Sequence, residues 1–544
     1  MSPPKRHPLI TGTLATGMGT LASRVLGMIR DMATAALFGL SGKGVADAFV
    51  MAYCIPNLFR RLFGEGALAA SYLPVLSVEL EKDRQGAWQL ASVLFTWLVV
   101  LLSGLVVLGE GLLLAARWIW GASPGVPLLL GLSAVMLPYL MLICLAAQLS
   151  ATLHALSHFT VPALTPTVLN LCWLAAAALA YFAPDQESQA YLLAMAILVA
   201  GVLQVAVQVP MLRRRGFRFD YNPTASREPL RRIGRTMAPM LIGLSVTQIN
   251  TFNDRLLAWV LARAPGDPER ISWLGDAVRY PLEQGAVAGI YYAERIYEFP
   301  VGIMGLAVAT AIFPLLSRHA ARGDRDKLGA DLALGLRMVI CLGVPAGVGL
   351  IVLAEPIARL LFEHGQFTAA DTVRAARMIA CYASGVWAYC ASHVLVRAFY
   401  ALGDAITPVK VAAWVVGLNL LLNLLLIWPL AEAGFAVATA LSAVVQVVAL
   451  MWLFSRRHAA LRWPELAATA ARTALATLLM AAASYGVLGL IAPAAGLLNE
   501  LLRVLLPLAA GGVVFCVAYR LFGGRELQML LRGGLPSHGQ WDAD

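Results

Sequence analysis

Ionisable residues embedded in long apolar segments are the side chains of this sequence best suited to chemistry. The first two apolar segments carry a mainly cationic group, and several later segments carry further charges. The residues concerned are Arg24, Arg30, Asp31, Asp47, Arg60, Arg61, Glu65, Glu294, Arg295, Glu298, Arg337, Arg377, His393 and Arg397. An ionised side chain in the middle of a membrane costs about 2.5–3.5 kcal/mol, so its presence there predicts a functional role.

Nearly all of these cations are arginine, which indicates the chemistry of the ligand. A planar guanidinium donates two parallel hydrogen bonds to a phosphate or a carboxylate, which an ammonium group cannot do. In the first two segments Arg24, Arg30, Arg60 and Arg61 outnumber the acids. We therefore predict a cationic cavity for an anionic substrate.

Helical spacing also predicts which of these charges share a helix face. Arg61 lies four residues before Glu65. Glu294 and Arg295 lie four and three residues before Glu298. Residues at these separations are neighbours on a helix, so each group can act together.

The competing interpretation of these charges is structural. They could form ion pairs that lock helices together, or reach the membrane surface with the charged end of a long side chain. We expect this interpretation to hold for Arg337 and Arg397, which lie near segment ends.

The elements that hold these residues follow from the composition. Of the 544 residues, 60% are hydrophobic, mean hydropathy is +0.74, and only 13% are charged, against about 25% in soluble domains. A soluble enzyme, a disordered chain and a nucleic-acid-binding protein are excluded on this basis. The apolar segments are continuous rather than alternating, which also excludes a membrane β-barrel.

The sequence predicts an all-α polytopic membrane protein with fourteen transmembrane helices. The expected spans are 9–39, 46–76, 87–117, 127–156, 160–183, 189–212, 236–263, 287–317, 329–360, 371–401, 406–428, 434–455, 467–491 and 500–522. Most Lys and Arg residues between spans lie in every second loop, including the basic stretch 213–235. The positive-inside rule therefore places these loops and both termini in the cytoplasm.

An internal repeat is visible at an offset of about 240 residues. Pro74 and Pro314 occur in similar short motifs, and each follows another mid-span proline, Pro56 or Pro300. We therefore predict two pseudo-symmetric six-helix lobes of the same orientation, as in transporters that alternate their access. The expected divisions are residues 1–212 for the first lobe, 213–235 for a basic linker, 236–456 for the second lobe, and 457–544 for two extra helices and a tail.

No metal or cofactor site is predicted. The seven cysteines lie in apolar stretches without a CxxC pair. His154 and His158 have the spacing of a metal-binding pair, but no acid or cysteine accompanies them.

Several motifs along the chain resemble the MurJ/MviN family. They are Ser23-Arg24-Val25-Leu26-Gly27-Met28-Ile29-Arg30-Asp31, Asp47-Ala48-Phe49, Pro56-Asn57-Leu58-Phe59-Arg60-Arg61-Leu62-Phe63-Gly64-Glu65-Gly66-Ala67, Tyr291-Tyr292-Ala293-Glu294-Arg295 with Glu298-Phe299-Pro300, Gly365-Gln366-Phe367-Thr368, and Phe399-Tyr400-Ala401-Leu402 with Thr407-Pro408. The resemblance covers essentially the whole chain in order. It departs from the family at the pair Asp254-Arg255 and in the loop near 264–286, and Glu294 stands where an aspartate is common.

This resemblance implies a lipid II flippase of peptidoglycan biosynthesis, with the fold of the multidrug/oligosaccharidyl-lipid/polysaccharide exporters. It implies a bacterial inner-membrane location and a substrate, undecaprenyl-pyrophosphate-linked disaccharide-pentapeptide, that crosses without any bond being made or broken. The last two helices would hold the lipid tail in an apolar groove. Membrane lipids and cell-wall synthesis proteins are further candidate partners, and no nucleic acid is expected.

The resemblance also implies roles for individual residues in a central cavity. The positions expected to bind the substrate are Arg24, Arg30, Asp47, Arg60, Arg61, Glu65, Arg295, Glu298 and Arg377. Coupling or gating is considered for Asp31, Glu294 and His393.

Three other functions remain open on sequence alone. The nearest is a flippase for another polyprenyl-linked glycan, which composition cannot distinguish from a lipid II flippase. A cation-coupled multidrug antiporter should instead have an acid-dominated cavity. A non-transporting scaffold for cell-wall enzymes would tolerate removal of the embedded charges.

Overall fold

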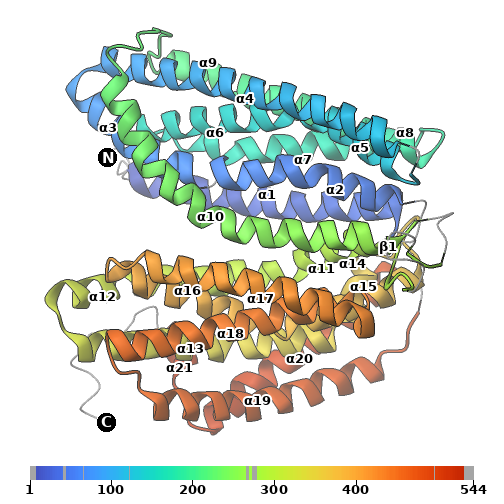
Figure 1. The fold of residues 1–544 in the computed structure, drawn as a ribbon. Coiled ribbons are helices and arrows are strands. Elements are labelled where there is room, and N and C mark those ends of the chain that lie inside the picture. The colour runs from blue at the N-terminus through green and yellow to red at the C-terminus, as the bar shows by residue number, and fades with distance from the viewer. Residues whose placement is uncertain are drawn as a thin grey trace, which may run out of the picture. The chain divides into compact units, whose positions relative to one another are not determined.

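A computed structural model of the chain describes residues 8–531, except 41–43, 65, 122, 265–268, 272–277 and 495. The described chain is almost entirely helical and divides into two compact units (Figure 1). Unit 1 comprises Met1–Ala288 and His364–Phe367, and unit 2 comprises Gly289–Glu363 and Thr368–Asp544. The division falls inside helix α11 (Ala286–Pro300).

The described residues of unit 1 ahead of α11 form ten helices, one π-helical turn and two short strands. They are α1 (Pro8–Phe38), α2 (Val45–Phe59), η1 (Arg60–Gly64), α3 (Ala67–Lys82), α4 (Arg84–Trp120), α5 (Val126–Met136), α6 (Tyr139–Ala155), α7 (Thr160–Ala180), α8 (Gln186–Ala206), α9 (Gln208–Arg214), α10 (Arg227–Leu261), β1 (Ala262–Arg263) and β2 (Leu282–Glu283). Helix α1 packs on α7, α4 on α6, and α10 on α3. The two strands pair in parallel, with Ala262 opposite Leu282.

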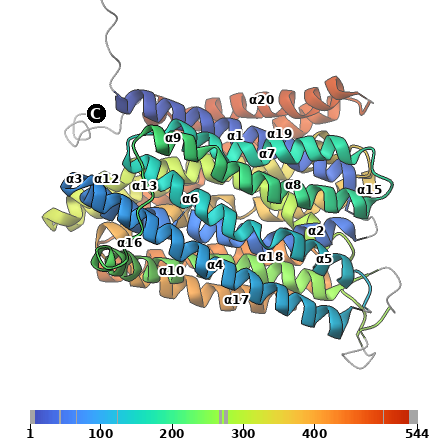
Figure 2. The ribbon, with the colours of Figure 1, turned by 90° about the horizontal axis from the view of Figure 1, so that it is seen from above.

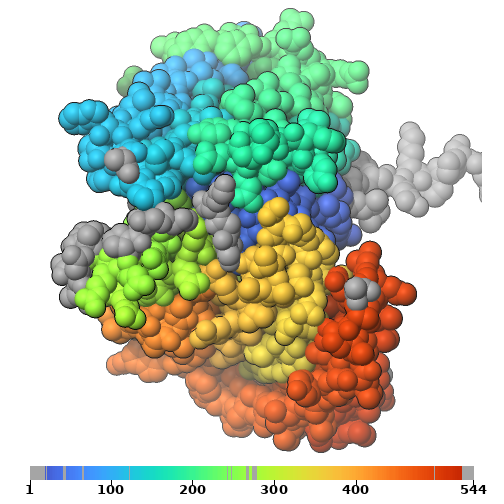
Figure 3. All heavy atoms as spheres, turned by 90° about the vertical axis from the view of Figure 1, so that its right-hand side faces the viewer, coloured from blue at the N-terminus to red at the C-terminus, as the bar shows by residue number. Residues whose placement is uncertain are grey.

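Unit 2 continues from α11 through a second π-helical turn to the last helices. Its elements are η3 (Val301–Gly305), α12 (Leu306–Arg322), α13 (Arg325–Val352), α14 (Ala354–Phe362), α15 (Ala369–Ala383), α16 (Val386–Ala401), α17 (Ile406–Leu430), α18 (Ala433–Arg457), α19 (Trp463–Leu490), α20 (Leu497–Leu521) and α21 (Glu526–Leu531). Helix α13 packs against α16 and α19, and Figures 1 and 2 both show α19 beside α20. In Figure 3 the atoms of the last part of the described chain, drawn orange to red, lie on the surface of unit 2.

The prediction of an all-α polytopic membrane protein is confirmed. Each predicted span coincides with one helix or with consecutive helices. Ten helices of the described chain are long and apolar enough to cross a membrane, or eleven when the pair α15 and α16, bent by 41°, is one span. Helices α1 and α10, which contain charged residues, are not among them, and neither are the shorter helices α2 and α3, of 15 and 16 residues. The count of fourteen therefore stays a prediction, as do the four divisions expected from the repeat.

Within the described residues, the π-helical turns η1 and η3 each follow a proline-containing helix. In unit 1, η1 follows α2, which contains Pro56; in unit 2, η3 follows Pro300, the last residue of α11. Proline lacks the N–H that would bond one turn back, so the helical ladder is interrupted at both places. The turns start at Arg60 and Val301, close to the offset at which the sequence repeats.

Candidate functional site

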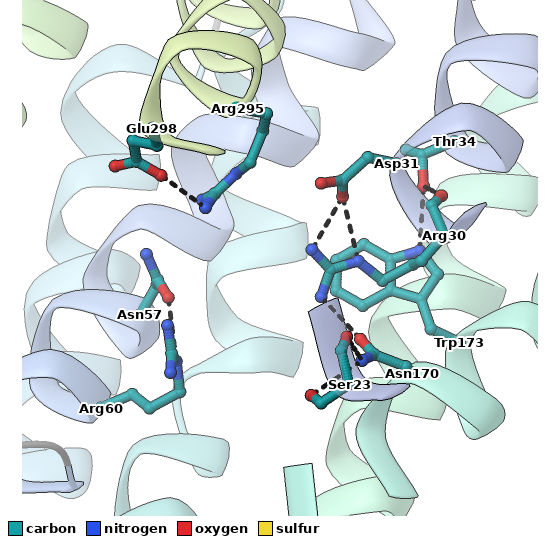
Figure 4. A network of polar contacts seen from close by, with 10 residues as sticks. All are labelled: Ser23, Arg30, Asp31, Thr34, Asn57, Arg60, Asn170, Trp173, Arg295 and Glu298. Carbon is teal, nitrogen blue, oxygen red and sulfur yellow. Dashed lines mark hydrogen bonds and ion pairs between the residues drawn. The ribbon is translucent and has the colours of Figure 1, made fainter. Parts of the chain in front are cut away.

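Arg30 on α1 is held by hydrogen bonds and by an aromatic side chain. Its Nε and Nη2 atoms both donate to Asp31 Oδ1, at 3.0 and 2.7 Å, and its Nη1 donates to Asn170 Oδ1 at 3.2 Å (Figure 4). The guanidinium carbon lies 4.6 Å from the centroid of the Trp173 ring. An ion pair, an amide and an aromatic face thus fix the plane of this cation.

The partners of Arg30 are themselves held in place. Asn170 Nδ2 donates to the carbonyl of Ser23 at 2.9 Å, and Trp173 Nε1 donates to Thr34 Oγ1 at 3.0 Å. Asn170 and Trp173 are buried on α7, the helix that packs along α1. The network therefore joins two helices and presents the guanidinium in one orientation.

Arg60 and Arg61 start the π-helical turn η1, and both are half-buried. Arg60 Nε donates to Asn57 Oδ1 at 3.1 Å (Figure 4). A π turn adds a residue to the helical ladder and so redirects the side chains around it. Arg24 is exposed on α1. Glu65 lies outside the described residues, so its predicted pairing with Arg61 stays a prediction.

The side chain of Asp47, a residue of α2, lies at the start of helix α11. This buried carboxylate on α2 accepts hydrogen bonds from the N–H groups of Gly285, at 2.6 Å, and Ala288, at 2.8 Å. Those N–H groups belong to the beginning of α11, where unpaired donors favour a negative charge. Asp47 therefore caps α11. The sequence alone does not predict this contact, because Asp47 and Gly285 are 238 residues apart.

In unit 2, α11 carries the predicted pair of Arg295 and Glu298. Arg295 Nη1 donates to Glu298 Oε2 at 3.0 Å, which confirms the contact expected from their spacing (Figure 4). The Arg295 guanidinium also lies 4.8 Å from the centroid of the Tyr291 ring. Glu294 is buried on the same helix, whereas 36% of the Glu298 side chain is exposed.

The remaining predicted residues of unit 2 lie on α15 and α16. Arg377 and His393 are both exposed. Arg397 donates to Thr310 Oγ1 at 2.8 Å. The structure thus assigns Arg397 to a contact between α16 and α12.

The structural interpretation of Arg337 is confirmed. Its guanidinium forms ion pairs with Glu465 at 2.7 Å and with Glu526 at 2.6 Å. Glu526 also accepts hydrogen bonds from Thr469 Oγ1 at 2.9 Å and from Tyr519 OH at 2.5 Å. These contacts hold α13, α19, α20 and α21 together.

Sequence reasoning missed Asn170, Trp173 and Asn57 as partners of arginines. Asn170 is a polar residue in an otherwise apolar segment, a signal that could have drawn attention to it. Nothing local indicates that it meets Arg30, because the two are 140 residues apart. The pair Asp254 and Arg255 is buried on α10, where Arg255 Nη1 lies 3.4 Å from Cys54 Sγ.

The helical units and their embedded arginines define a polytopic membrane protein with a transporter fold. A solved structure titled lipid II flippase MurJ in an inward closed conformation shares this fold with a TM-score of 0.73 at 23% identity, covering 95% of this chain and 100% of that one. An inward-facing multidrug-resistance MATE family transporter of the MOP superfamily has a TM-score of 0.65 at 13% identity, covering 80% and 94%.

The chain belongs to the lipid II flippase MurJ family, whose model matches residues 34–506. A probable lipid II flippase MurJ of Vibrio cholerae serotype O1 is 33% identical over 81% of this chain and 82% of that protein. One of Rhizobium tropici is 33% identical over 96% of both chains. The lipid II flippase MurJ of Burkholderia cenocepacia is 32% identical over 78% of this chain and 79% of that one.

Proposed function

We propose that this protein moves lipid II, the undecaprenyl-pyrophosphate-linked disaccharide-pentapeptide, from the cytoplasmic to the periplasmic leaflet of the bacterial inner membrane. Membership of the MurJ family over residues 34–506 is the observation that carries this proposal. The protein acts as a transporter and not as an enzyme, because the substrate crosses without a change in its bonds. Both termini lie in the cytoplasm, as the positive-inside rule predicts.

Binding of the pyrophosphate is assigned to the predicted set of arginines. The fixed guanidinium of Arg30 supports this role, because an oriented donor loses little freedom when it binds a phosphate oxygen. Arg24 and Arg377 are exposed, and Arg60 and Arg61 are half-buried, so all four retain surface for a ligand. The same proposal includes Glu65, Arg295 and Glu298.

The structure supports different roles for the acids. Asp31 orients Arg30, and Asp47 holds the start of α11, so we assign both to positioning rather than to direct contact with the substrate. Coupling or gating stays a proposal for Glu294 and His393. The apolar helices α19 and α20 are proposed to hold the polyprenyl tail while the headgroup crosses by alternating access.

The test uses cells whose growth depends on this protein. When the protein is depleted, lipid II should accumulate on the inner leaflet, measured by its accessibility to an external modifying enzyme. Wild-type protein should restore accessibility, and Arg30→Ala should not, although it is present in the membrane at the same level. Arg397→Ala is the matched control, since this arginine also lies in an apolar helix but bonds only a hydroxyl in the described contacts. Accumulation of a different polyprenyl-linked glycan, with lipid II still flipped, would contradict the proposal.

A further inference from the structure

A cavity inside unit 1 lies away from the arginine network of α1. Its volume is about 530 Å³, within the range of about 300–1,000 Å³ typical of small-molecule sites. The walls come from α4, α6, the α8–α9 region and the segment that follows α9. Leu149, Val209 and Leu212 are among the apolar side chains that line it.

The mouth of this cavity is cationic. Arg213 and Arg218 line it, and both are exposed. They belong to the basic stretch that follows α8, at the end of a membrane-spanning segment. Arginines at this level of a membrane protein lie where anionic lipid headgroups are found.

The outer wall is held in place by an aromatic contact and by hydrogen bonds. The Phe217 ring packs edge-on against Trp88 of α4, with centroids 5.3 Å apart. The backbone N–H of Asp220 donates to Ser92 Oγ at 3.0 Å, and Gln89 Nε2 donates to Asp220 Oδ2 at 2.9 Å. These contacts hold the segment 217–220 against α4 and so maintain the cavity.

Gln148 and Thr152 are buried polar residues of the lining. Gln148 is 1% exposed, and its Nε2 donates to the carbonyl of Ala91 at 2.9 Å. Gln148 Oε1 accepts no hydrogen bond within the described chain. The charged residues among those that line the cavity are Arg213 and Arg218, so the charge of an anionic ligand would be held there.

We propose that this cavity binds an acyl chain of an anionic phospholipid whose phosphate is held by Arg213 and Arg218. The apolar walls suit a hydrocarbon chain, and the arginines suit the phosphate. From Val205 to Arg213 the lining extends over about 12 Å, at a helical rise of about 1.5 Å per residue. This length accommodates a large part of one acyl chain. A free phosphate would use the mouth but not the apolar interior.

The first experiment tests the headgroup on the purified, delipidated full-length protein. Titration with phosphatidylglycerol should raise the melting temperature, and native mass spectrometry should show a retained lipid. The double variant R213Q/R218Q should bind about thirtyfold more weakly, given about 1 kcal/mol for each basic residue at a membrane surface. The control R214Q/R231Q removes two exposed charges of the same basic region that do not line the cavity.

The second experiment tests whether the cavity holds the acyl chain of the lipid. Val209→Trp should fill the cavity and weaken binding of long-chain phosphatidylglycerol, with little effect on a six-carbon analogue. Val209→Met adds less side-chain volume to the cavity and replaces the tryptophan variant if that variant does not fold. Phosphatidylethanolamine with the same chains serves as the headgroup control.

Several results would overturn the proposal. They are equal stabilisation by phosphatidylethanolamine, wild-type affinity in R213Q/R218Q, complete competition by inorganic phosphate, and unchanged long-chain binding in both filling variants. Arg30→Ala should retain phosphatidylglycerol binding. Failure of the flippase proposal and failure of this lipid site can therefore be told apart.

Discussion

Arg30 shows how a charge inside an apolar helix is tolerated and oriented. Asp31 compensates its charge, Asn170 accepts a third hydrogen bond, and Trp173 covers one face. The loss of one hydrogen bond from such a network destabilises the fold, because each polar group in it is removed from water. The charge of Arg30 is therefore compensated within the fold, and its guanidinium is held in one plane.

Replacement of Arg30 by lysine should abolish complementation while the protein remains at wild-type level. An ammonium group keeps the charge but cannot bond Asp31 and Asn170 in one plane or stack on Trp173. Growth of the depleted strain and membrane abundance measure the two effects. Arg397→Lys should support normal growth, and wild-type growth of Arg30→Lys would show that the planar network is dispensable.

At the scale of elements, the π-helical turns η1 and η3 of the described chain start at a separation close to the offset of the predicted internal repeat. Each follows a proline-containing helix in its own half of the chain. π turns frequently occur at functional sites, and η1 carries Arg60 and Arg61. We interpret both turns as places where a helix can change its bend.

Pro300→Ala should reduce transport several-fold while slightly raising the melting temperature. Alanine restores the missing N–H and favours a regular helix through η3. The matched control is Pro166→Ala, because Pro166 lies within α7, which is regular along its length. Transport assays and melting curves of both variants test this, and unchanged transport by Pro300→Ala would rule out a hinge at η3.

The short helix α21 is tied to unit 2 by Glu526, which should make stability depend on pH. Burial raises the pKa of this carboxyl, but hydrogen bonds from Tyr519 and Arg337 outweigh burial and lower the pKa from 4.5 to about 2. The ionised group therefore contributes stability that is complete above pH 4.5 and is lost as pH falls toward 2.

Glu526→Gln should lower stability by about 3 kcal/mol at neutral pH, because Arg337 loses a buried partner. The variant should also lose much of the wild-type fall in melting temperature between pH 4.5 and 2. Glu500→Gln serves as the control, as this acid lies in the first turn of α20 outside the cluster. An unchanged acid profile in Glu526→Gln would assign the pH dependence to other groups.

At the scale of the whole molecule, net charge and its placement bear on how transport is driven. The proposed headgroup carries a pyrophosphate, and an inside-negative potential drives anions outward by about 2.3 kcal/mol per charge per 100 mV. After release, the same potential would draw the arginines of the predicted cavity back toward the cytoplasm. Both steps can therefore proceed on membrane potential alone.

Collapse of the potential by an electrogenic ionophore should arrest flipping even when a pH gradient is maintained. Lipid II accessibility at the outer leaflet, measured within minutes of ionophore addition, provides the readout. The control dissipates only the pH gradient and should leave flipping intact. Arrest in that control would instead indicate proton coupling through Glu65, Glu294, Glu298 or His393.

The membrane class, the helical segments and the family could all be predicted from the sequence. Transfer of apolar side chains into a bilayer is nearly additive along the chain, so local composition is sufficient to identify a span. The contact of Arg295 with Glu298 was also predictable, because three residues on a helix always lie close together.

Tertiary structure decided which charges have partners and what those partners do. Arg30 meets Asn170 from a helix distant in sequence, Asp47 caps α11, and Arg337 meets Glu526 across 189 residues. These pairings depend on how separate helices pack, which no local pattern records. Whether an embedded arginine is structural or available to a ligand is therefore settled by packing, because burial and hydrogen-bonding partners determine how much of its charge remains exposed.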